Sequence, residues 1–530
     1  MGNRLSALVV VGALLVAGGA AGQTGPTQDE LYRAADSHEW LLPNKDYAGV
    51  RFADLDQITP ANASQLRPVC QFQGADLIRS QSNPLVYRGV LYVTTTYSTI
   101  ALDPVSCRVK WRHDWKARAK EGNTSVKNRG VALKDGKVIR GTQDGYLIAL
   151  DAQSGKLVWE VAAARPERFE AIGMTPIAFE DLVIVGPNGS EYGVKGWIGA
   201  FRLSDGQPVW KFNTIPDEGE PGADSWGDTD ARLKGGGAIW TTPSLDARRG
   251  LVFVPVGNPA PDFFANQRPG ANLYTNAMIV LDARTGQLQW YKQGVPHDTH
   301  DWDLPVVSPL FTGTLAGKRR DIVTMGGKDG LVRMIDRDTH EELFAVTVTT
   351  RLNVDEVPTE DGVYACPGGV GGMEWSVPSF NPATGRMVAP AVDWCGIFRT
   401  DEPRFVAGQQ FLGGSFSFDP VEKSRGWLTA FDAYTGQVAW RYQAERPMLA
   451  AVTSTAGGVL FTGELTGDFI TLDEASGEIL YRFNLGGSVT GGVISYAVGG
   501  KQYVAVVSGM AAGFWQTQPG AMTLTVFALP

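Results

Sequence analysis

A dense run of polar side chains occupies residues 297–303, shortly after an apolar segment that ends in a tryptophan. Asp301 and Asp303 in this run are two residues apart, and on an extended strand this spacing places both carboxylates on one face, roughly 6 to 7 Å apart. His297 and His300 suggest a different chemistry, because together with the neighbouring Asp residues they could bind zinc. Residues i and i+3 of a strand face opposite ways, so this histidine spacing is weak support for zinc.

Two further oxygen-bearing side chains lie outside this run. Glu191 belongs to the Gly-rich segment 189–196, and Asn258 follows the apolar strand expected at residues 251–256. Both are hard oxygen donors of the kind that Ca²⁺ requires, and this ion takes roughly six to eight ligands. Each also has a simpler interpretation, because Glu191 could be a solvated turn carboxylate and Asn258 an amide that caps a turn.

A repeated phrase indicates the scaffold that must position these side chains. Its pattern is apolar-x-Asp-x-x-(Thr/Ser)-Gly-x-x-x-aromatic, and it predicts a β-hairpin, because Asp can bond the turn backbone and Gly supplies a positive φ. The clear copies are residues 149–159, 280–290 and 430–440, the weaker copies end at Trp111, Trp210, Phe344 and Tyr481, and a fragment occupies residues 381–385. We expect the terminal aromatic side chain of each copy to dock on the neighbouring blade.

Most of these aromatic positions recur roughly 40 to 50 residues apart, a period typical of propeller blades. Counting the fragment gives eight copies, so we expect an all-β chain that folds as an eight-bladed β-propeller of four-stranded antiparallel blades. The interval between Trp210 and Trp290 is much longer and includes the acidic insertion 216–234, the segment 235–240 and Asn258. Sites are usually built where polar residues interrupt a rigid scaffold, so this interval is where we expect one.

Composition sets further limits. The chain has 530 residues and a formal net charge of −9, and no basic run with interleaved aromatics occurs, which argues against nucleic-acid binding. One repeat unit cannot bury its own faces, so we expect residues 23–530 to form a single propeller domain. The four cysteines allow three pairings, of which we expect Cys70–Cys107 and Cys366–Cys395.

The amino terminus predicts export. Arg4 precedes an apolar stretch at residues 7–17, and small residues at 20–22 suit cleavage, so residues 1–22 are expected to be a signal peptide. The opening Met1-Gly2 also fits an acylation pattern, but the apolar stretch favours export. No later segment is apolar enough to span a membrane. We therefore expect a soluble chain in the periplasm.

The ordered sequence motifs carry a family resemblance. Residues 128–132 (Asn-Arg-Gly-Val-Ala), 189–196, 301–303 (Asp-Trp-Asp) and 366–369 (Cys-Pro-Gly-Gly) occur in the order found in dehydrogenases that depend on pyrroloquinoline quinone (PQQ). The chain resembles the alcohol dehydrogenases of the eight-bladed quinoprotein class, without a fused cytochrome domain, almost from end to end. This resemblance implies an enzyme that transfers a hydride from an alcohol to PQQ.

The resemblance also implies a metal and a catalytic base. It assigns Glu191, Asn258 and Asp301 to the metal site, with Asp301 as the base that removes the alcohol proton. Asp303 matches the additional carboxylate of lanthanide-using relatives, although sugar-oxidising relatives carry Asp at this position too. The expected ion is Ca²⁺, with a lanthanide as the alternative. Because a cation lowers the pKa of a neighbouring carboxylate whereas burial raises it, the two effects on Asp301 oppose each other.

The resemblance further implies a set of cofactor contacts. Trp240 matches the ring on which the quinone stacks, and Arg129 matches a basic residue that binds the carboxylates of the quinone. Lys328 matches a catalytic cation beside the quinone carbonyl groups. The complete set of expected PQQ contacts is Gln81, Arg129, Thr142, Gly189, Ser190, Trp240 and Lys328. Trp240 also has a structural interpretation as a core residue, and Thr142 as a turn residue.

Several positions depart from the family pattern. The replacements are Asn123-Thr124 for an adjacent-cysteine disulfide, Gln81 for Glu, Ala238 for Thr, His300 and Leu449 for Trp, and Glu374 for Asn. The metal-and-base set is retained while the surroundings of the cofactor differ. This combination suggests a differently lined pocket, suited to a larger alcohol, a polyol or a sugar.

These observations favour a periplasmic PQQ-dependent alcohol dehydrogenase that passes electrons to a cytochrome c. Two alternatives remain open at this point. One is a non-catalytic eight-bladed scaffold of the outer-membrane assembly type, which would leave Glu191, Asn258 and Asp301 unexplained. The other is a degenerate quinoprotein that binds PQQ without turnover.

Overall fold

The first strand of most sheets is a short run of buried residues, whereas the fourth strand alternates mainly between exposed and half-buried side chains. Such a gradient arises when short sheets stand around a common centre and bury their innermost strands. The computed structural model describes residues 25–74, 81–118, 127–227, 229–509, 513–517 and 520–530. The expected signal peptide, residues 1–22, lies outside this part of the chain.

Four sheets in the first half of the chain are four-stranded antiparallel meanders. The first two comprise β3 (Leu85–Tyr87), β4 (Val90–Thr94), β5 (Ser98–Leu102) and β6 (Val109–Asp114), then β7 (Ala132–Lys134), β8 (Lys137–Gly141), β9 (Tyr146–Asp151) and β10 (Leu157–Ala162). The next two comprise β11 (Ile177–Phe179), β12 (Leu182–Val185), β13 (Trp197–Arg202) and β14 (Pro208–Asn213), then β15 (Ser244–Asp246), β16 (Leu251–Pro255), β17 (Ala277–Asp282) and β18 (Leu288–Gln293).

Three further sheets of this kind follow. The first comprises β19 (Leu310–Leu315), β20 (Lys318–Gly326), β21 (Leu331–Asp336) and β22 (Glu342–Thr347), and the second β24 (Ser379–Asn381), β25 (Arg386–Asp393), β28 (Arg425–Asp432) and β29 (Val438–Ala444). The third comprises β30 (Thr453–Thr455), β31 (Val459–Gly463), β32 (Asp468–Asp473) and β33 (Ile479–Asn484), to which β1 (Phe52–Ala53) adds a parallel fifth strand.

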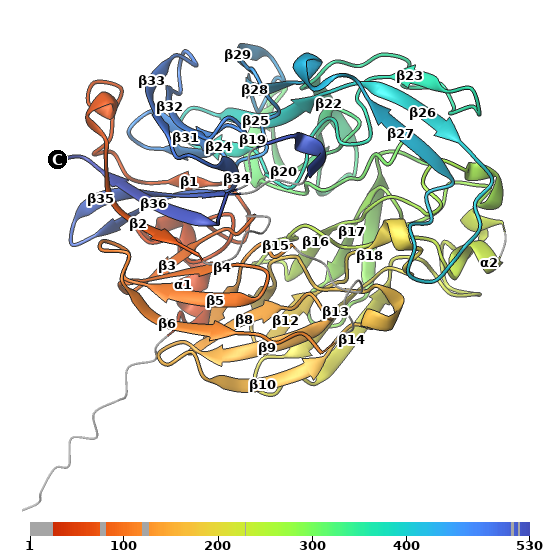
Figure 1. Ribbon diagram of the computed structural model, residues 1–530, viewed down its shortest axis with the longest axis horizontal. Coiled ribbons are helices and arrows are strands. Elements are labelled where there is room, and N and C mark those ends of the chain that lie inside the picture. Colours follow the sequence, from red (N-terminus) through yellow and green to blue (C-terminus); the bar gives the residue numbers. More distant parts are fainter. Residues whose placement is uncertain (1–24, 75–80, 119–126, 228, 510–512, 518–519) are drawn as a thin grey trace, which may run out of the picture.

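The last four-stranded sheet joins the two ends of the chain. It consists of β34 (Ser488–Val498), β35 (Lys501–Gly509) and β36 (Thr523–Ala528), and the amino-terminal strand β2 (Arg67–Gln73) pairs antiparallel with β36. The sheets follow one another around a common centre in Figure 1. The protein is therefore an all-β chain of propeller type, as the repeat predicts.

Helices are few and short in the described residues. The α-helices are α1 (Gln28–Tyr32) and α2 (Thr229–Arg232). A separate three-stranded sheet of β23 (Val363–Ala365), β26 (Gly396–Thr400) and β27 (Gly414–Phe418) lies at the rim of the ring (Figure 1). The sequence pattern did not predict this sheet.

The hairpin phrases behave as predicted. The indole Nε1 of each of four tryptophans donates to a carbonyl of the following sheet: Trp111 to Ala152 at 3.0 Å, Trp159 to Leu203 at 3.1 Å, Trp210 to Ala283 at 3.0 Å and Trp440 to Glu474 at 3.0 Å. Gly155 in the turn has φ +70°, and a Cβ there would lie 2.5 Å from the Trp111 ring. Glycine therefore serves both the turn and the docking, and the predicted docking between blades is confirmed.

The interpretation of residues 381–385 as an eighth phrase is wrong. This segment joins β24 to β25, so it belongs to the sheet that already carries the phrase ending at Trp440. The sheet without a phrase is the one that closes the ring through β2 and β36. An Asn-x-x-Thr-Gly turn suits any tight hairpin, which explains the error.

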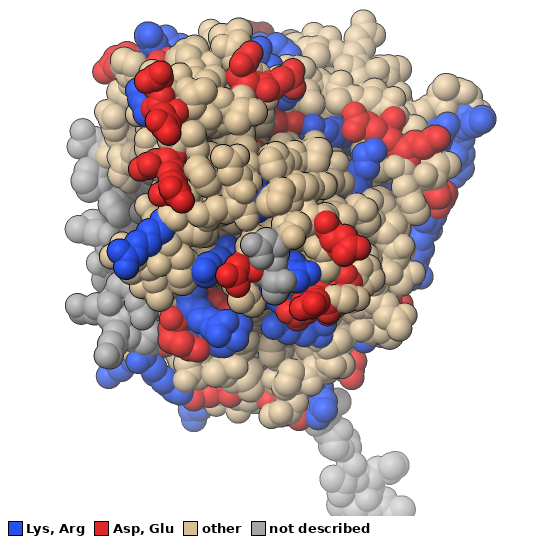
Figure 2. Space-filling view, turned by 90° about the vertical axis from the view of Figure 1, so that its right-hand side faces the viewer, with Lys and Arg blue, Asp and Glu red and all other residues tan. Residues whose placement is uncertain are grey.

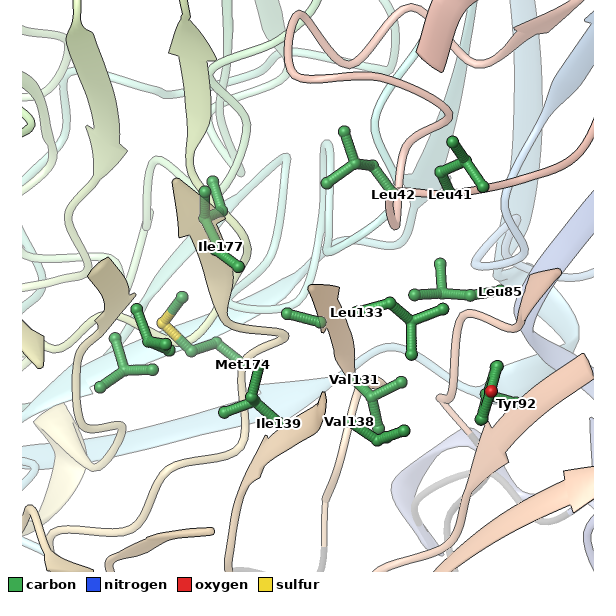
Figure 3. Close-up of a cluster of buried hydrophobic side chains, with 14 of the residues drawn as sticks. Leu41, Leu42, Leu85, Tyr92, Val131, Leu133, Val138, Ile139, Met174 and Ile177 are labelled. Carbon is green, nitrogen blue, oxygen red and sulfur yellow. The ribbon is translucent and has the colours of Figure 1, made fainter. Parts of the chain in front are cut away.

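Apolar packing between neighbouring sheets holds the ring together. Leu85 of β3, Leu133 of β7 and Ile177 of β11 belong to one buried cluster with Leu41 and Leu42 of the amino-terminal segment (Figure 3). Both predicted disulfides are present, and Cys70–Cys107 ties the closing strand β2 to the turn before β6. On the face that carries α2 and the three-stranded sheet, acidic and basic side chains are interspersed (Figure 2).

Candidate active site

Lys328 joins the two carboxylates of the polar run. Its Nζ lies 3.1 Å from Asp301 Oδ2 and 2.7 Å from Asp303 Oδ2. The lysine follows β20 in a tight turn, where its backbone N–H donates to the Asp303 carbonyl at 3.0 Å. Burial lowers the pKa of Lys328, but the charges of Asp301 and Asp303 outweigh this effect and hold the pKa well above its ordinary value. The lysine therefore stays charged.

The two carboxylates converge for a reason other than strand alternation. Residues 297–303 are not in a strand, and Asp301 has a left-handed backbone with φ +58°. The Asp298 carboxylate shapes the loop, because Oδ1 accepts from His300 N–H and Oδ2 from Trp302 N–H, each at 2.9 Å. The prediction of an extended strand here is wrong, although both carboxylates still reach one lysine.

Asn258 contacts the same cluster from the end of β16. Its backbone N–H donates to Asp303 Oδ1 at 2.8 Å, and its side-chain Nδ2 donates to the Pro259 carbonyl at 3.1 Å. Its Oδ1 is buried and has no hydrogen-bond partner. At Gly257 a Cβ would lie 2.7 Å from Asp303 Oδ1, so only glycine lets the chain approach this carboxylate so closely.

Glu191 lies on a single turn of 3-10 helix, η4 (Ser190–Tyr192), between two glycines with left-handed φ. Gly189 has φ +119° and Gly193 φ +64°, so the Gly-rich sequence around Glu191 is a conformational requirement. The Ser190 hydroxyl accepts from Ala238 N–H at 3.0 Å, which fixes this turn to the next sheet. The Glu191 carboxylate is close enough to Asp301 to raise the pKa of Asp301.

Asp301 itself is held in a strongly perturbed environment. Burial is the largest cause of a pKa raised well above the ordinary value, Lys328 lowers it, and Asp303 and Glu191 raise it further. One oxygen, Oδ1, is buried without a hydrogen-bond partner. In the protein without a bound cation, burial and the neighbouring carboxylates therefore outweigh the effect of Lys328 on the pKa of Asp301.

Trp240 lies beside two cations. The Arg129 guanidinium is 5.0 Å from the Trp240 ring and 5.6 Å from the Trp375 ring, and Lys328 Nζ is 5.9 Å from the Trp240 ring. Arg129 Nη1 donates to the Trp240 carbonyl at 2.8 Å, and burial lowers the pKa of Arg129 to about 10. A flat ring flanked by two cations suits a planar anion.

Gln81 and Thr142 are two further expected cofactor contacts. Gln81 is buried, and its Oε1 has no hydrogen-bond partner. The Thr142 hydroxyl donates to Asp144 Oδ1 at 2.6 Å and accepts from Tyr146 N–H at 2.9 Å, so it is already engaged in its own turn. A contact of Thr142 with the cofactor stays a prediction, as do those of Gly189 and Ser190.

The two histidines do not converge. His297 is exposed, with Nδ1 2.7 Å from the Gly270 carbonyl, whereas His300 is buried and stacks on Trp302 with ring centroids 4.3 Å apart. The ring of Phe398 lies edge-on to the His300 ring, with centroids 4.7 Å apart. A zinc site that uses both histidines is therefore not formed.

Two further acidic residues, Glu374 and Asp262, are buried near these side chains. Glu374 is buried near Lys328, and burial raises its pKa to about 7. Asp262, which the sequence reasoning missed, is 1% exposed and lies near Asp301, Glu191 and Asp303. The signal that could have found Asp262 is a charged residue between prolines and phenylalanines, four positions after Asn258.

The donor set fits a hard cation. Buried oxygens without a hydrogen-bond partner belong to Asn258, Asp301 and Asp262, and carboxylate and amide oxygens are the ligands that such ions prefer. Within the described ranges, no three His, Cys, Asp or Glu side chains are grouped closely enough to hold a metal. An ion would therefore have to draw the oxygens together around Asn258 and compete with Lys328 for the carboxylates.

Comparison with known proteins identifies the family of the chain. The family described as glucose/ethanol/alcohol dehydrogenase, β-propeller domain, and designated PQQ, matches residues 40–361. The chain belongs to the PQQ-dependent alcohol dehydrogenase family. The predicted family and the prediction of an enzyme are thereby confirmed.

Individual relatives in this quinoprotein family cover nearly the whole chain. A putative dehydrogenase XoxF of Paracoccus denitrificans is 32% identical over 95% of this chain and 91% of its own length. The quinohemoprotein alcohol dehydrogenase ADH IIB of Pseudomonas putida is 30% identical over 89% of this chain and 73% of its own length. The solved structure of a europium-containing methanol dehydrogenase superposes with a TM-score of 0.88 at 26% identity, covering 94% of this chain and 100% of that chain.

A second family model matches the carboxy-terminal part of this quinoprotein. Residues 424–516 also match the family described as outer membrane protein assembly factor BamB, a segment that contains none of the predicted site residues. In the part of the chain that the structure describes, no helix is long and apolar enough to cross a membrane. As in its family, PQQ and a metal ion are the expected cofactors.

Proposed function

We propose that the protein oxidises an alcohol to an aldehyde or ketone with PQQ and a metal ion bound between Trp240 and Asp301. The observation that carries this proposal is the buried group of Asp301, Asp303 and Lys328 beside Asn258. Family membership alone would allow a protein that has lost this machinery, whereas here Lys328 contacts both Asp301 and Asp303, and Asn258 contacts Asp303.

The proposed metal ligands are Glu191, Asn258, Asp301 and Asp303, and the ion is Ca²⁺ or a lanthanide. When bound, the quinone accepts the hydride of the alcohol, and the metal supplies a Lewis acid. Trp240 offers a flat surface to the quinone, and Arg129 offers two or more N–H donors to carboxylates. Gln81, Thr142, Gly189 and Ser190 are proposed as further polar contacts.

Proton removal is assigned to Asp301. Its Oδ1 has no partner and is available to accept the alcohol proton, while its Oδ2 is held by Lys328 at 3.1 Å. Because burial and the neighbouring carboxylates raise the pKa of Asp301, a bound cation is proposed to favour its ionised form. Lys328 keeps its charge and stabilises negative charge that develops on the quinone side of the site.

The scaffold is proposed to be an eight-bladed propeller, with residues 23–530 as a single domain. In support, seven four-stranded sheets and the four antiparallel strands of the five-stranded sheet succeed one another along the chain, and β2 closes the ring. Residues 1–22 are proposed as a signal peptide, which would place the enzyme in the periplasm. A cytochrome c is the proposed electron acceptor.

The substrate is proposed to be a larger alcohol, a polyol or a sugar. His300 packs against Trp302 and Phe398 close to Asp301, in the position where alcohol-oxidising relatives usually carry Trp. A histidine is smaller and can form hydrogen bonds, which suits a substrate with more than one hydroxyl group.

Reconstitution tests the proposal. The full chain would be loaded with PQQ and either Ca²⁺ or La³⁺, and dye-linked oxidation measured with methanol, longer alcohols, polyols and aldoses. We expect turnover of at least one alcohol with one metal. Absence of PQQ binding with both metals would refute the enzyme and leave a non-catalytic scaffold of the outer-membrane assembly type. PQQ binding without turnover would indicate a degenerate quinoprotein.

A further inference from the structure

Asp262 has a buried carboxyl group with one oxygen that is left without a hydrogen-bond partner among the described residues. It is 1% exposed, and its Oδ1 has no hydrogen-bond partner. A carboxylate in this position costs several kcal/mol of folding free energy unless a cation or donors compensate it. The residue therefore needs a partner that the chain itself does not supply.

The nearest cation is committed elsewhere. Arg268 donates from Nε to the Pro261 carbonyl at 2.9 Å and from Nη2 to the backbone carbonyls of Asp262 and Asp298. Its Nη1 donates to Asn272 Oδ1 at 2.8 Å. These bonds engage the guanidinium with backbone and amide oxygens. Arg268 therefore acts on the Asp262 carboxyl group through its charge, which lowers the pKa of Asp262 less than burial and the neighbouring carboxylates raise it.

The same bonds fix where the Asp262 side chain can be. Arg268 ties the backbone at Asp262 to the backbone at Asp298, and so joins the loop after Asn258 to the loop that carries Asp301 and Asp303. Phe263 N–H donates to the Leu412 carbonyl at 2.8 Å and holds the loop from the other side. The backbone at Asp262 is thus anchored to the loop that carries Asp301 and Asp303.

The surroundings of Asp262 are strongly acidic. After burial, Asp301, Glu191 and Asp303 are the main causes that hold its pKa well above the ordinary value. Asp262 is therefore close enough to Asp301, Glu191 and Asp303 for their charges to act on it. Asn258 is 1% exposed, and its side-chain oxygen also has no hydrogen-bond partner. Orphaned oxygens from two separate loops point to a cation of high charge as the missing partner.

Resting on the function proposed above, we propose that Asp262 is a further carboxylate of the metal site and that its charge makes the site prefer a trivalent lanthanide ion to Ca²⁺. An additional negative charge attracts a trivalent ion more than a divalent ion, because the Coulomb energy scales with the charge of the ion. When a bound cation ionises the carboxyl groups of Glu191, Asp262, Asp301 and Asp303, Lys328 supplies a single positive charge against them, and a trivalent ion matches the remaining negative charge better than a divalent ion.

The test compares ion affinities. The full chain, stripped of metal and loaded with PQQ, would be titrated with Tb³⁺, followed by tryptophan-sensitised luminescence, and with Ca²⁺ in competition. In Asp262→Asn we expect the Tb³⁺ affinity to fall at least about tenfold and the Ca²⁺ affinity to fall less. Asp355→Asn is the matched control, because it removes the same charge from an exposed loop position, and its affinities should stay within about twofold of the wild type.

Thermal unfolding gives a second readout and a check on folding. Asp262→Asn and Asp262→Ser both remove a buried carboxyl group whose ionised form the metal-free protein disfavours, so the metal-free variants should melt at the same or a higher temperature than the wild type. Their increase in melting temperature on adding Tb³⁺ should be smaller. Failure of both variants to fold would contradict the inference.

The outcomes separate this inference from the proposed function. If the wild type binds PQQ and metal but both Asp262 variants keep its Tb³⁺ affinity, the role of Asp262 is overturned and the enzyme is not. An equal loss of Ca²⁺ and Tb³⁺ affinity would overturn the preference for the trivalent ion. If the wild type binds neither Tb³⁺ nor Ca²⁺ nor PQQ, the proposed function fails together with the inference.

Discussion

Lys328 Nζ lies 2.7 Å from Asp303 Oδ2 in a pair whose side chains are 7% and 3% exposed. An ion pair so deeply buried is stabilised by its geometry but becomes costly when one partner is removed, because the remaining charge stays desolvated. The stability of the metal-free protein and the chemistry of the site therefore depend on the same lysine.

Lys328→Met tests this dependence. It leaves Asp301 and Asp303 without their cation and should lower the free energy of unfolding of the metal-free protein by about 3 to 5 kcal/mol, measured with urea. Lys318→Met, at an exposed position of β20, is the control and should have little effect. Added metal should recover part of the loss, because the ion takes over the compensating charge. A similar stability of the two variants would contradict the assigned pair.

Asp301→Asn separates proton removal from binding. The amide keeps the shape of the side chain but cannot accept the alcohol proton, so turnover should fall roughly 10²- to 10⁴-fold. PQQ binding, measured by absorbance titration, should be retained. The exposed variant Asp355→Asn should keep wild-type turnover. Unchanged turnover in Asp301→Asn would refute its role as the base.

Gly257→Ala probes the close approach of the chain to Asp303. The new Cβ would lie 2.7 Å from Asp303 Oδ1 and 3.0 Å from the Ala238 carbonyl, so one of these groups must move. We expect a loss of about 1 to 3 kcal/mol in the free energy of unfolding together with weaker metal binding. Gly513→Ala has nothing within 4 Å of its Cβ and serves as the control.

Glu374 makes stability depend on pH. Burial raises its pKa from 4.5 to about 7, so between these values the folded protein binds more protons than the unfolded chain. The free energy of unfolding contributed by this group therefore falls as pH rises through this window, by at most about 3 kcal/mol. Glu374→Gln removes the effect, so in the absence of metal and PQQ the variant should gain stability over the wild type between pH 5 and pH 8. Parallel pH profiles of the two proteins would count against this assignment.

Sequence reasoning predicted the parts of the fold that local chemistry determines. The Asp-to-Gly turn and the docking of Trp111, Trp159, Trp210 and Trp440 follow from short-range rules, and both disulfides were predicted. The separate three-stranded sheet was missed, because its strands carry no copy of the repeated phrase.

The candidate site shows a similar division. The residue types at 191, 258, 301, 303 and 328 were found by resemblance, but the loop that presents Asp301 was predicted as a strand. Its conformation depends on the Asp298 carboxylate, which accepts two backbone N–H groups within its own loop. Asp262 was missed because burial among other carboxylates is a tertiary property that the local sequence does not reveal.

The sheet that pairs β2 with β36 has a consequence for how the chain can be made. The strand at residues 67–73 lacks its partner until residues 523–528 have been synthesised, so a nascent or truncated chain holds an open array of sheets. Bringing the two strands together closes a loop of nearly the whole chain, at an entropic cost that grows only with the logarithm of its length. Loss of the last few residues would therefore leave two exposed strand edges, which are sites of aggregation.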